Sequence, residues 1–496
     1  MFKICSHSQL RRISSGIAGR ATPEGTRFYK SKFKDMPFAR NIKQDLYSSR
    51  VGFGSFRFKQ SNQQVLEQAL LSGINLIDTS AHFQMGASEK TIGSAISNLI
   101  EKNAISRSEI VVCSKAGFIF DSNESFPQMK FIKNNNYHCI HPEFLDAQLN
   151  QSLERLNLQT LDILLLNNPE RLLQANDQSV TVDTLYQMIE KAFEYLESQV
   201  ENGRIGGYGV ASNSISIPTA LDHLSITKLF KSSKFSNFTT VQYPFNLFER
   251  HAIQQGFDGT PSLAEICDEY QLFQMTQRPF LSITRDGVRK LTTSSSNKSE
   301  QDINENATKQ FELVTEMELK LQAYLEEEDY DDMSLPAKFV VAQVLGENIG
   351  RLVENKMAAQ LFFNRDIKPV LNTDLNYLIK CSETDDSRVG QEFILDWVAN
   401  YRKETLKLMD CILEIADWHL DRSNIQLNDN VSLNAYKASL ATNSLGICLS
   451  ASNPDTTSVL VGIRSQTQLD HAIQTAKLPL LDEDQIERLF DNPMLM

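Results

Sequence analysis

The sequence predicts an α/β fold, a (β/α)₈ TIM barrel with a large helical insertion before the last strand. Short continuous apolar runs alternate with amphipathic stretches from residue 50 onward, which is typical of a parallel sheet buried on both faces. Seven such runs fall within about 230 residues, more than a flavodoxin-like sheet contains and suited to a barrel. An eighth, TTSVLVGIRS (456–465), follows only after a segment of about 150 residues without strand-like alternation.

Helix signals separate the expected strands in the first half of the chain. Gly73 stands where a helix would end, and Ser88 stands where the next would begin, each a residue type favoured at that position. The expected strands there are 50–56, 74–80, 109–117 and 161–168, and the expected helices are 62–73, 88–103, 142–158 and 183–203. Further strands are expected at 204–212, 238–246 and 272–280, with a helix at 261–270.

Composition divides the chain into four parts. Residues 1–49 form a basic presequence, 50–285 the first seven barrel strands, 286–440 the insertion, and 441–496 the last strand with C-terminal helices. The insertion opens with the polar tract TTSSSNKSEQDINEN, which has the composition of a linker, and continues with helical periodicity.

The insertion is strongly acidic near its start. Residues 301–335 hold 11 acidic and 2 basic side chains, with a peak at EEEDYDD (326–332). A solvated helix face and loop would account for such a run. The alternative is a docking surface for a basic protein partner.

The first twenty residues have the composition of an organelle transit peptide. They contain Lys3, Arg11, Arg12 and Arg20, four serines and no acid, and they lack the continuous apolar segment of a secretory signal. We expect the mitochondrion as the destination, with plastid or cytoplasm as alternatives. A merely disordered basic tail is the other interpretation.

The rest of the composition excludes several classes. The net charge is −13 although residues 1–50 hold 11 Lys/Arg and 3 Asp/Glu, so the remaining chain is acidic and disfavours nucleic acid as a partner. No apolar run reaches the roughly 18 residues of a membrane span. Seven cysteines without a CxxC pair predict free thiols in a reducing compartment and no metal site.

Function in a barrel of this type is expected where strands end and βα loops begin. An Asp and a Lys that face each other across the mouth would form a buried ion pair and lower the pKa of a neighbouring acid. The polar side chains at the expected strand ends are Asp78, Lys115, Asn167, Ser212, Asn213, Gln242, Arg278 and Arg464.

Six segments in this order carry a family resemblance. They are GINLIDTSAHF…SEKTIGSAI (73–96), RSEIVVCSKAG (107–117), SLERLNLQTLDILLLNNPE (152–170), GRIGGYGVASNS (203–214), VQYPFNLFER (241–250) and VLVGIRS (459–465). As a set they resemble the aldo-keto reductases over residues 50–285 and 440–475, which leaves the insertion unmatched.

The resemblance implies hydride transfer from NADPH to a carbonyl through an Asp-Tyr-Lys-His tetrad. The Asp falls on Asp78 and the Lys on Lys115, but the Tyr falls on Phe83 and the His on Asn167. A phenyl ring has no proton to give, whereas Asn167 still has a hydrogen-bond donor for a carbonyl oxygen. His82, directly before Phe83, is a replacement acid to consider.

The cofactor side of the resemblance is better kept. The family's Ser-Asn pair and Gln, which hold the nicotinamide carboxamide, fall on Ser212, Asn213 and Gln242. Its GxRS motif, which holds the adenosine 2′-phosphate, falls on Gly462, Arg464 and Ser465 at an expected helix start, where free N–H groups favour anions. We therefore expect NADP(H) as the cofactor. No role is expected for Arg278.

Two functions remain open from the sequence. The first is a pseudoenzyme of the reductase fold that binds NADP(H), or only a partner, and acts as a regulatory or scaffold subunit in the organelle. The second is an active NADPH-dependent oxidoreductase that reduces an aldehyde, ketone or quinone with a non-standard proton donor. A role with RNA is disfavoured by the acidic body.

Overall fold

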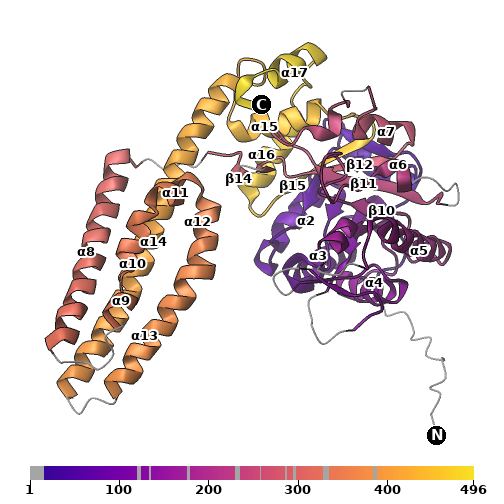
Figure 1. Ribbon diagram of the computed structural model, residues 1–496. Coiled ribbons are helices and arrows are strands. Elements are labelled where there is room, and N and C mark those ends of the chain that lie inside the picture. Colours follow the sequence, from indigo (N-terminus) through magenta and orange to yellow (C-terminus); the bar gives the residue numbers. More distant parts are fainter. Residues whose placement is uncertain are drawn as a thin grey trace, which may run out of the picture. The chain divides into compact units, whose positions relative to one another are not determined.

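The computed structural model describes residues 16–495, except 120–124, 133–135, 176–178, 230–234, 257–258, 285–286, 294–297, 328–334 and 384–387. The chain divides into two compact units (Figure 1). We call the first, Met1–Phe280 with Asn434–Lys437 and Thr442–Met496, the barrel unit. The second, Leu281–Leu433 with Ala438–Ala441, is the bundle unit.

The barrel unit contains a closed barrel of eight parallel strands, which confirms the predicted fold class. The last strand closes it, because it pairs with the strand before the insertion (Gln274↔Thr457) and with the first barrel strand (Val459↔Val51). In spatial order from that first strand, the barrel consists of β3 Val51–Gly54, β4 Leu76–Asp78, β5 Val111–Ala116, β9 Ile163–Asn167, β10 Tyr208–Ala211, β11 Phe238–Pro244, β12 Phe273–Gln277 and β15 Thr457–Gly462.

Amphipathic helices surround these strands (Figure 1) and bury their apolar faces against them. Burial of each large apolar side chain contributes about 1.5–3 kcal/mol, so the apolar stripes hold the helices in place. The helices of this unit are α2 Gln63–Leu71, α3 Ala87–Glu101, α4 Pro142–Leu156, α5 Val182–Glu201, α6 Ile226–Leu229, α7 Leu263–Glu269, most of α15 Leu440–Ser450, α16 Gln466–Ala476 and α17 Glu483–Phe490.

Residues 16–49 fold against the start of the barrel strands, an arrangement that the sequence analysis did not predict. They form α1 Pro23–Lys32 and an antiparallel hairpin of β1 Phe38–Asn41 and β2 Leu46–Ser49. Ala21, Ala39 and Leu46 belong to the same apolar cluster as residues inside the barrel. Residues 1–15 of the predicted presequence lie outside the described residues.

Short elements decorate the loops of the barrel unit. A three-stranded sheet of β6 Phe118–Ile119, β7 Lys130–Phe131 and β8 Tyr137–His138 follows β5. The short helical turns are η1 Gln60–Asn62, η2 Phe83–Gly86, η3 Arg107–Glu109, η4 Pro169–Gln174, η5 His251–Ile253 and η7 Pro493–Leu495.

The bundle unit has its own apolar core, in which the rings of Trp397 and Tyr401 stack with centroids 4.4 Å apart. Its elements are the hairpin β13 Leu281–Thr284 and β14 Gly287–Lys290, then α8 Glu300–Glu327, α9 Leu335–Lys338, α10 Val341–Glu347, α11 Ile349–Glu354, α12 Lys356–Phe362, the π-helical turn η6 Phe363–Ile367, α13 Lys368–Glu383 and α14 Arg388–Val431.

Two details of the bundle unit bear on the sequence predictions. Helix α8 begins at Glu300, so the second half of the tract expected to be a linker is helical. Most of the acidic peak at 326–332 lies outside the described residues. Among the helices that the structure describes, none is long and apolar enough to cross a membrane.

Candidate functional site

The carboxyl ends of the barrel strands bring the expected tetrad positions to one opening. Asp78 ends β4 and Lys115 lies near the end of β5, and these neighbouring strands pair in parallel. The Lys115 Nζ lies 2.5 Å from Asp78 Oδ1 and also donates to the carbonyl oxygen of Thr79 at 2.9 Å. Asp78 and Lys115 are 5% and 4% exposed. The predicted ion pair is therefore formed, and it is buried.

Gln242 links the cofactor positions to this ion pair. Its Nε2 donates to Asp78 Oδ1 at 3.0 Å, so that carboxylate oxygen accepts hydrogen bonds from both Gln242 and Lys115. Gln242 is 1% exposed, and its Oε1 has no hydrogen-bond partner among the described residues. A buried amide oxygen without a donor costs free energy, which a bound N–H donor would recover.

Phe83 occupies the position beside the lysine. It begins the turn η2, and Lys115 Nζ lies 5.0 Å from the centroid of its ring, within the range of a cation–π interaction. The ring of Phe56 packs edge-on against Phe83 with centroids 5.3 Å apart. Two consecutive residues of the turn, Gln84 and Met85, have φ values of 53°, a conformation that L-residues rarely adopt.

Asn167 ends β9 and lies close to the end of β4. Its Nδ2 donates to Ser80 Oγ at 3.4 Å, and both residues are buried. The backbone oxygen of Asn167 lies 2.7 Å from His138 Nε2 of β8. Burial lowers the pKa of His138 to about 4, so this imidazole is neutral at pH 7 and donates its N–H to Asn167.

His82 packs against an aromatic ring. Its imidazole lies 4.7 Å from the ring centroid of Phe118, which in turn contacts His138 edge-on at 4.9 Å. Burial lowers the pKa of His82. A neutral imidazole is a poor general acid near pH 7, and this weakens the hypothesis that His82 replaces the missing tyrosine.

Ser212 and Asn213 form a turn directly after β10. The Ser212 hydroxyl oxygen accepts from the backbone N–H groups of Ser214 at 3.2 Å and Ile215 at 3.1 Å. Asn213 accepts at its side-chain oxygen from Gln277 Nε2 at 3.4 Å and from Arg278 Nη2 at 3.3 Å. The sequence analysis expected no role for Arg278, and the structure places it against a cofactor position.

The GxRS segment leads from β15 into α16 as expected. Ser465 is the N-cap of α16 and accepts from the backbone N–H of Gln468. Arg464 is exposed, and its backbone is fixed by hydrogen bonds with Gln468 Oε1 and with Asn62 Nδ2, both at 2.8 Å. A Cβ at Gly462 would meet no atom within 4 Å, so there is open space beside this residue. The segment combines a helix N-terminus with an exposed guanidinium.

Sequence reasoning missed several buried residues near the site. Glu170 follows β9, and its Oε1 accepts from the backbone N–H of Asn213 at 3.0 Å. Its position in the segment NNPE after an expected strand was the only available signal, since carboxylates are mostly exposed. Ser80 and His138 also went unnoticed, the latter because it lies in the two-residue strand β8, which is too short to show a periodic pattern.

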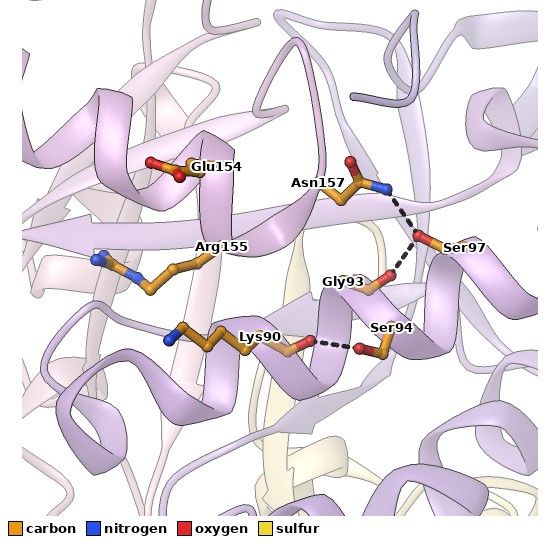
Figure 2. Close-up of a pocket in the computed structure, with 7 residues that line it drawn as sticks. All are labelled: Lys90, Gly93, Ser94, Ser97, Glu154, Arg155 and Asn157. Carbon is orange, nitrogen blue, oxygen red and sulfur yellow. Dashed lines mark hydrogen bonds between the residues drawn. The ribbon is translucent and has the colours of Figure 1, made fainter. Parts of the chain in front are cut away.

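A separate pocket lies on the outside of the barrel, between α3 and α4 (Figure 2). There Asn157 Nδ2 donates to Ser97 Oγ, whose hydroxyl donates to the carbonyl oxygen of Gly93. A Cβ at Gly93 would lie 2.7 Å from the backbone oxygen atoms of Arg155 and Leu156, so the glycine permits close helix packing. We assign the pocket a packing role and place the candidate site at the strand ends.

Part of the chain is similar in sequence to known proteins. Residues 50–273 match the sequence model of the Aldo/keto reductase family. D-threo-aldose 1-dehydrogenase of Pseudomonas sp is 29% identical over 136 residues, which is 26% of this chain and 38% of that protein. Aldo-keto reductase YhdN of Bacillus subtilis is 23% identical over 212 residues, 41% of this chain and 52% of that protein. The chain thus matches about half or less of the length of these relatives.

A solved structure shares the fold. The holo form of aldo-keto reductase AKR11C1 from Bacillus halodurans superimposes with a TM-score of 0.50 at 13% identity, over 92% of this chain and 96% of that one. At this level of identity the likeness supports the barrel architecture alone.

Proposed function

Because residues 50–273 form a domain of the aldo/keto reductase family, we propose that the barrel binds NADP(H) but is impaired in proton transfer to a carbonyl substrate. In this proposal the protein is a regulatory or scaffold subunit. Its destination, from the basic N-terminal composition, is the mitochondrion.

The residues at the mouth fit the cofactor. The orphaned Oε1 of Gln242 is suited to accept from the amide group of a nicotinamide carboxamide. Ser212 and Asn213 flank it from the neighbouring strand, since Ser212 N–H donates to the Gln242 backbone oxygen at 2.9 Å. The exposed Arg464 and the N-terminus of α16 suit the 2′-phosphate. A nicotinamide held at this opening would supply hydride.

One observation supports the proposed loss of proton transfer. The ammonium of Lys115, held by Asp78, lies over the Phe83 ring where a phenol would receive the effect of the positive charge. General acid catalysis contributes about 10²–10⁴-fold to a rate, and a phenyl ring contributes none of it. The ion pair that would activate an acid is thus present without the acid.

The second candidate function is an active reductase of aldehydes, ketones or quinones. The buried Asn167 amide and Ser80 hydroxyl support it, because both bear protons near the end of β9. An amide N–H can stabilise developing negative charge on oxygen without transferring its proton. A carbonyl that is already polarised would need less acid catalysis, and water would then complete the protonation.

Nucleotide titration followed by a substrate panel separates the two functions. Protein that lacks residues 1–15 should be titrated with NADPH by fluorescence and then offered aldehydes, ketones and quinones. Binding without turnover supports the impaired barrel, and turnover at ordinary rates supports the active reductase. Absence of NADPH binding contradicts both and leaves a pure scaffold.

A further inference from the structure

A buried carboxylate lies behind the turn that the proposed function assigns to the carboxamide. Glu170 belongs to η4, three residues after the end of β9, and it is 1% exposed. Its Oε1 accepts from the backbone N–H of Asn213 at 3.0 Å. The orientation of Asn213 therefore depends on a side chain that sequence reasoning did not consider.

Asn213 is held from two directions. Its backbone is held by Glu170, and its side-chain oxygen by Gln277 and Arg278. Arg278 is itself fixed by an ion pair with Glu249 at 3.1 Å. With the side-chain oxygen already occupied, the Asn213 amide N–H₂ is the part that remains for a ligand oxygen.

We propose that Glu170 is a positioning residue for Asn213 and that its carboxylate gives the site a preference for the oxidised, cationic form of the cofactor. The inference rests on the proposed function, because it concerns the nicotinamide that the proposed function places at this turn. The oxidised ring carries a positive charge and the reduced ring carries none, so a nearby carboxylate distinguishes them.

The charge of Glu170 is poised to change near neutral pH. Burial is the largest influence and raises its pKa to about 7. The hydrogen bonds from the Asn213 N–H and the Ser212 hydroxyl, and the positive charge of Arg171, act in the opposite direction and lower it. A cationic ring would favour the carboxylate, so binding of NADP⁺ should release a proton, whereas binding of NADPH should not.

Other charged or titratable groups face this region from the elements packed around it. Arg171 comes from η4 itself, Arg278 from the end of β12 and Glu249 from the segment after β11. His138 comes from β8, and its pKa of about 4 keeps it neutral in the range of interest. His223 also lies against this turn, with its Nδ1 3.0 Å from the backbone oxygen of Ser214, so only a pH effect that Glu170→Gln abolishes is assigned to Glu170.

The test compares the dissociation constants of NADP⁺ and NADPH at pH 6 and pH 8. Their ratio cancels the titration of the phosphate groups that both forms carry. We expect the preference for NADP⁺ to increase about fivefold from pH 6 to pH 8 if the bound cation lowers the pKa by one unit. Calorimetry at pH 7 in buffers of different ionisation enthalpy should show proton release with NADP⁺ only.

Two variants make the result specific. Glu170→Gln keeps the shape and an acceptor for the Asn213 N–H but should remove both the change in ratio and the proton release, while Glu170→Asp should retain part of each. The matched control is Glu154→Gln, an exposed carboxylate of α4, which should behave as the wild type.

The outcomes separate this inference from the proposed function. If the wild type binds neither nucleotide, the proposed function is wrong and the inference falls with it. If both nucleotides bind but the ratio does not depend on pH, only the inference is overturned. It is equally overturned if the ratio changes with pH as much in Glu170→Gln as in the wild type.

Discussion

The ammonium nitrogen of Lys115 lies 5.0 Å from the centre of the Phe83 ring. Lys115 is fixed by Asp78 and by the carbonyl oxygen of Thr79, so it does not depend on the ring for its position. The ion pair that would lower the pKa of an acid is thus present on β4 and β5. The acid itself is absent, because Phe83 lacks the hydroxyl of a tyrosine.

Restoring that oxygen should restore activity. Phe83→Tyr places a phenol beside Lys115, whose charge lowers the phenol pKa, and Asn167→His adds a carbonyl-orienting group. We expect the double variant to gain about 10²-fold or more in NADPH-dependent aldehyde reduction and to exceed the product of the single effects. Phe56→Tyr is the control, since it adds a phenol to the neighbouring ring. An inert double variant that still binds NADPH would place the block elsewhere.

Arg464→Ala should weaken the binding of NADPH far more than the binding of NADH. Only NADPH carries the 2′-phosphate, and a charge-assisted hydrogen bond contributes about 1.5–3 kcal/mol, which corresponds to a loss of roughly 10–150-fold. Fluorescence titration of both nucleotides measures the effect. Arg488→Ala on α17 is the control and should change neither affinity. Equal losses of affinity for both nucleotides would contradict the role of Arg464 in binding the 2′-phosphate.

Removing residues 1–49 should destabilise the barrel unit severely, whereas removing residues 1–15 should not. The longer deletion takes away Leu46 and Tyr29, whose burial contributes about 1.5–3 kcal/mol each, and the hydrogen bond of 2.6 Å from Ala21 N–H to Asp162. Soluble yield and thermal unfolding of the two truncations measure the difference. A long deletion as stable as the short one would show that residues 16–49 are dispensable.

Residues 1–50 fused to a fluorescent reporter should direct it to mitochondria. The expectation rests on the basic, serine-rich and acid-free first twenty residues. A matched fusion with Arg11→Glu and Arg12→Glu should stay diffuse, because the charge pattern is what import would require. Diffuse signal from the unaltered fusion would contradict the targeting hypothesis.

The stability of the protein should fall with rising pH in the range set by Glu170. Its pKa rises from an ordinary 4.5 to about 7 on folding, so the folded state binds the proton more tightly than the unfolded state. The penalty is absent below pH 4.5 and approaches about 3 kcal/mol above pH 7. Glu170→Gln should therefore raise the thermal midpoint at pH 8 and leave it unchanged at pH 4.5. Equal midpoints at pH 8 would contradict the raised pKa.

The barrel strands were predictable because each is an uninterrupted apolar run, the pattern of a strand covered on both faces. The hairpin of β1 and β2 was not, because few of its buried residues are apolar, and charged residues such as Arg40 and Lys43 give residues 1–49 the composition of a leader. Strands of two residues, such as β8, are too short to show any period.

The candidate site divides in the same way. Asp78, Lys115 and Gln242 were found from position, since the ends of parallel strands converge. Glu170 and His138 were not, because their burial depends on the packing of the short elements η4 and β8, which carry no periodic signal. The hydrogen bond from Gln242 to Asp78, 164 residues apart, likewise depends on closure of the barrel.

The strand that closes the barrel is the last to be synthesised. Thr457 pairs with Gln274, yet about 180 residues separate the end of β12 from the start of β15. At roughly 5–20 residues per second, a ribosome needs about 10–40 s to make that segment. During this time β3 and β12 have no partner on one side, and such open edges invite pairing with other chains. The bundle unit can bury its own core in the same interval. The open barrel edges stay exposed until Gly462 emerges, so folding succeeds only if aggregation is slower than synthesis or a chaperone prevents it.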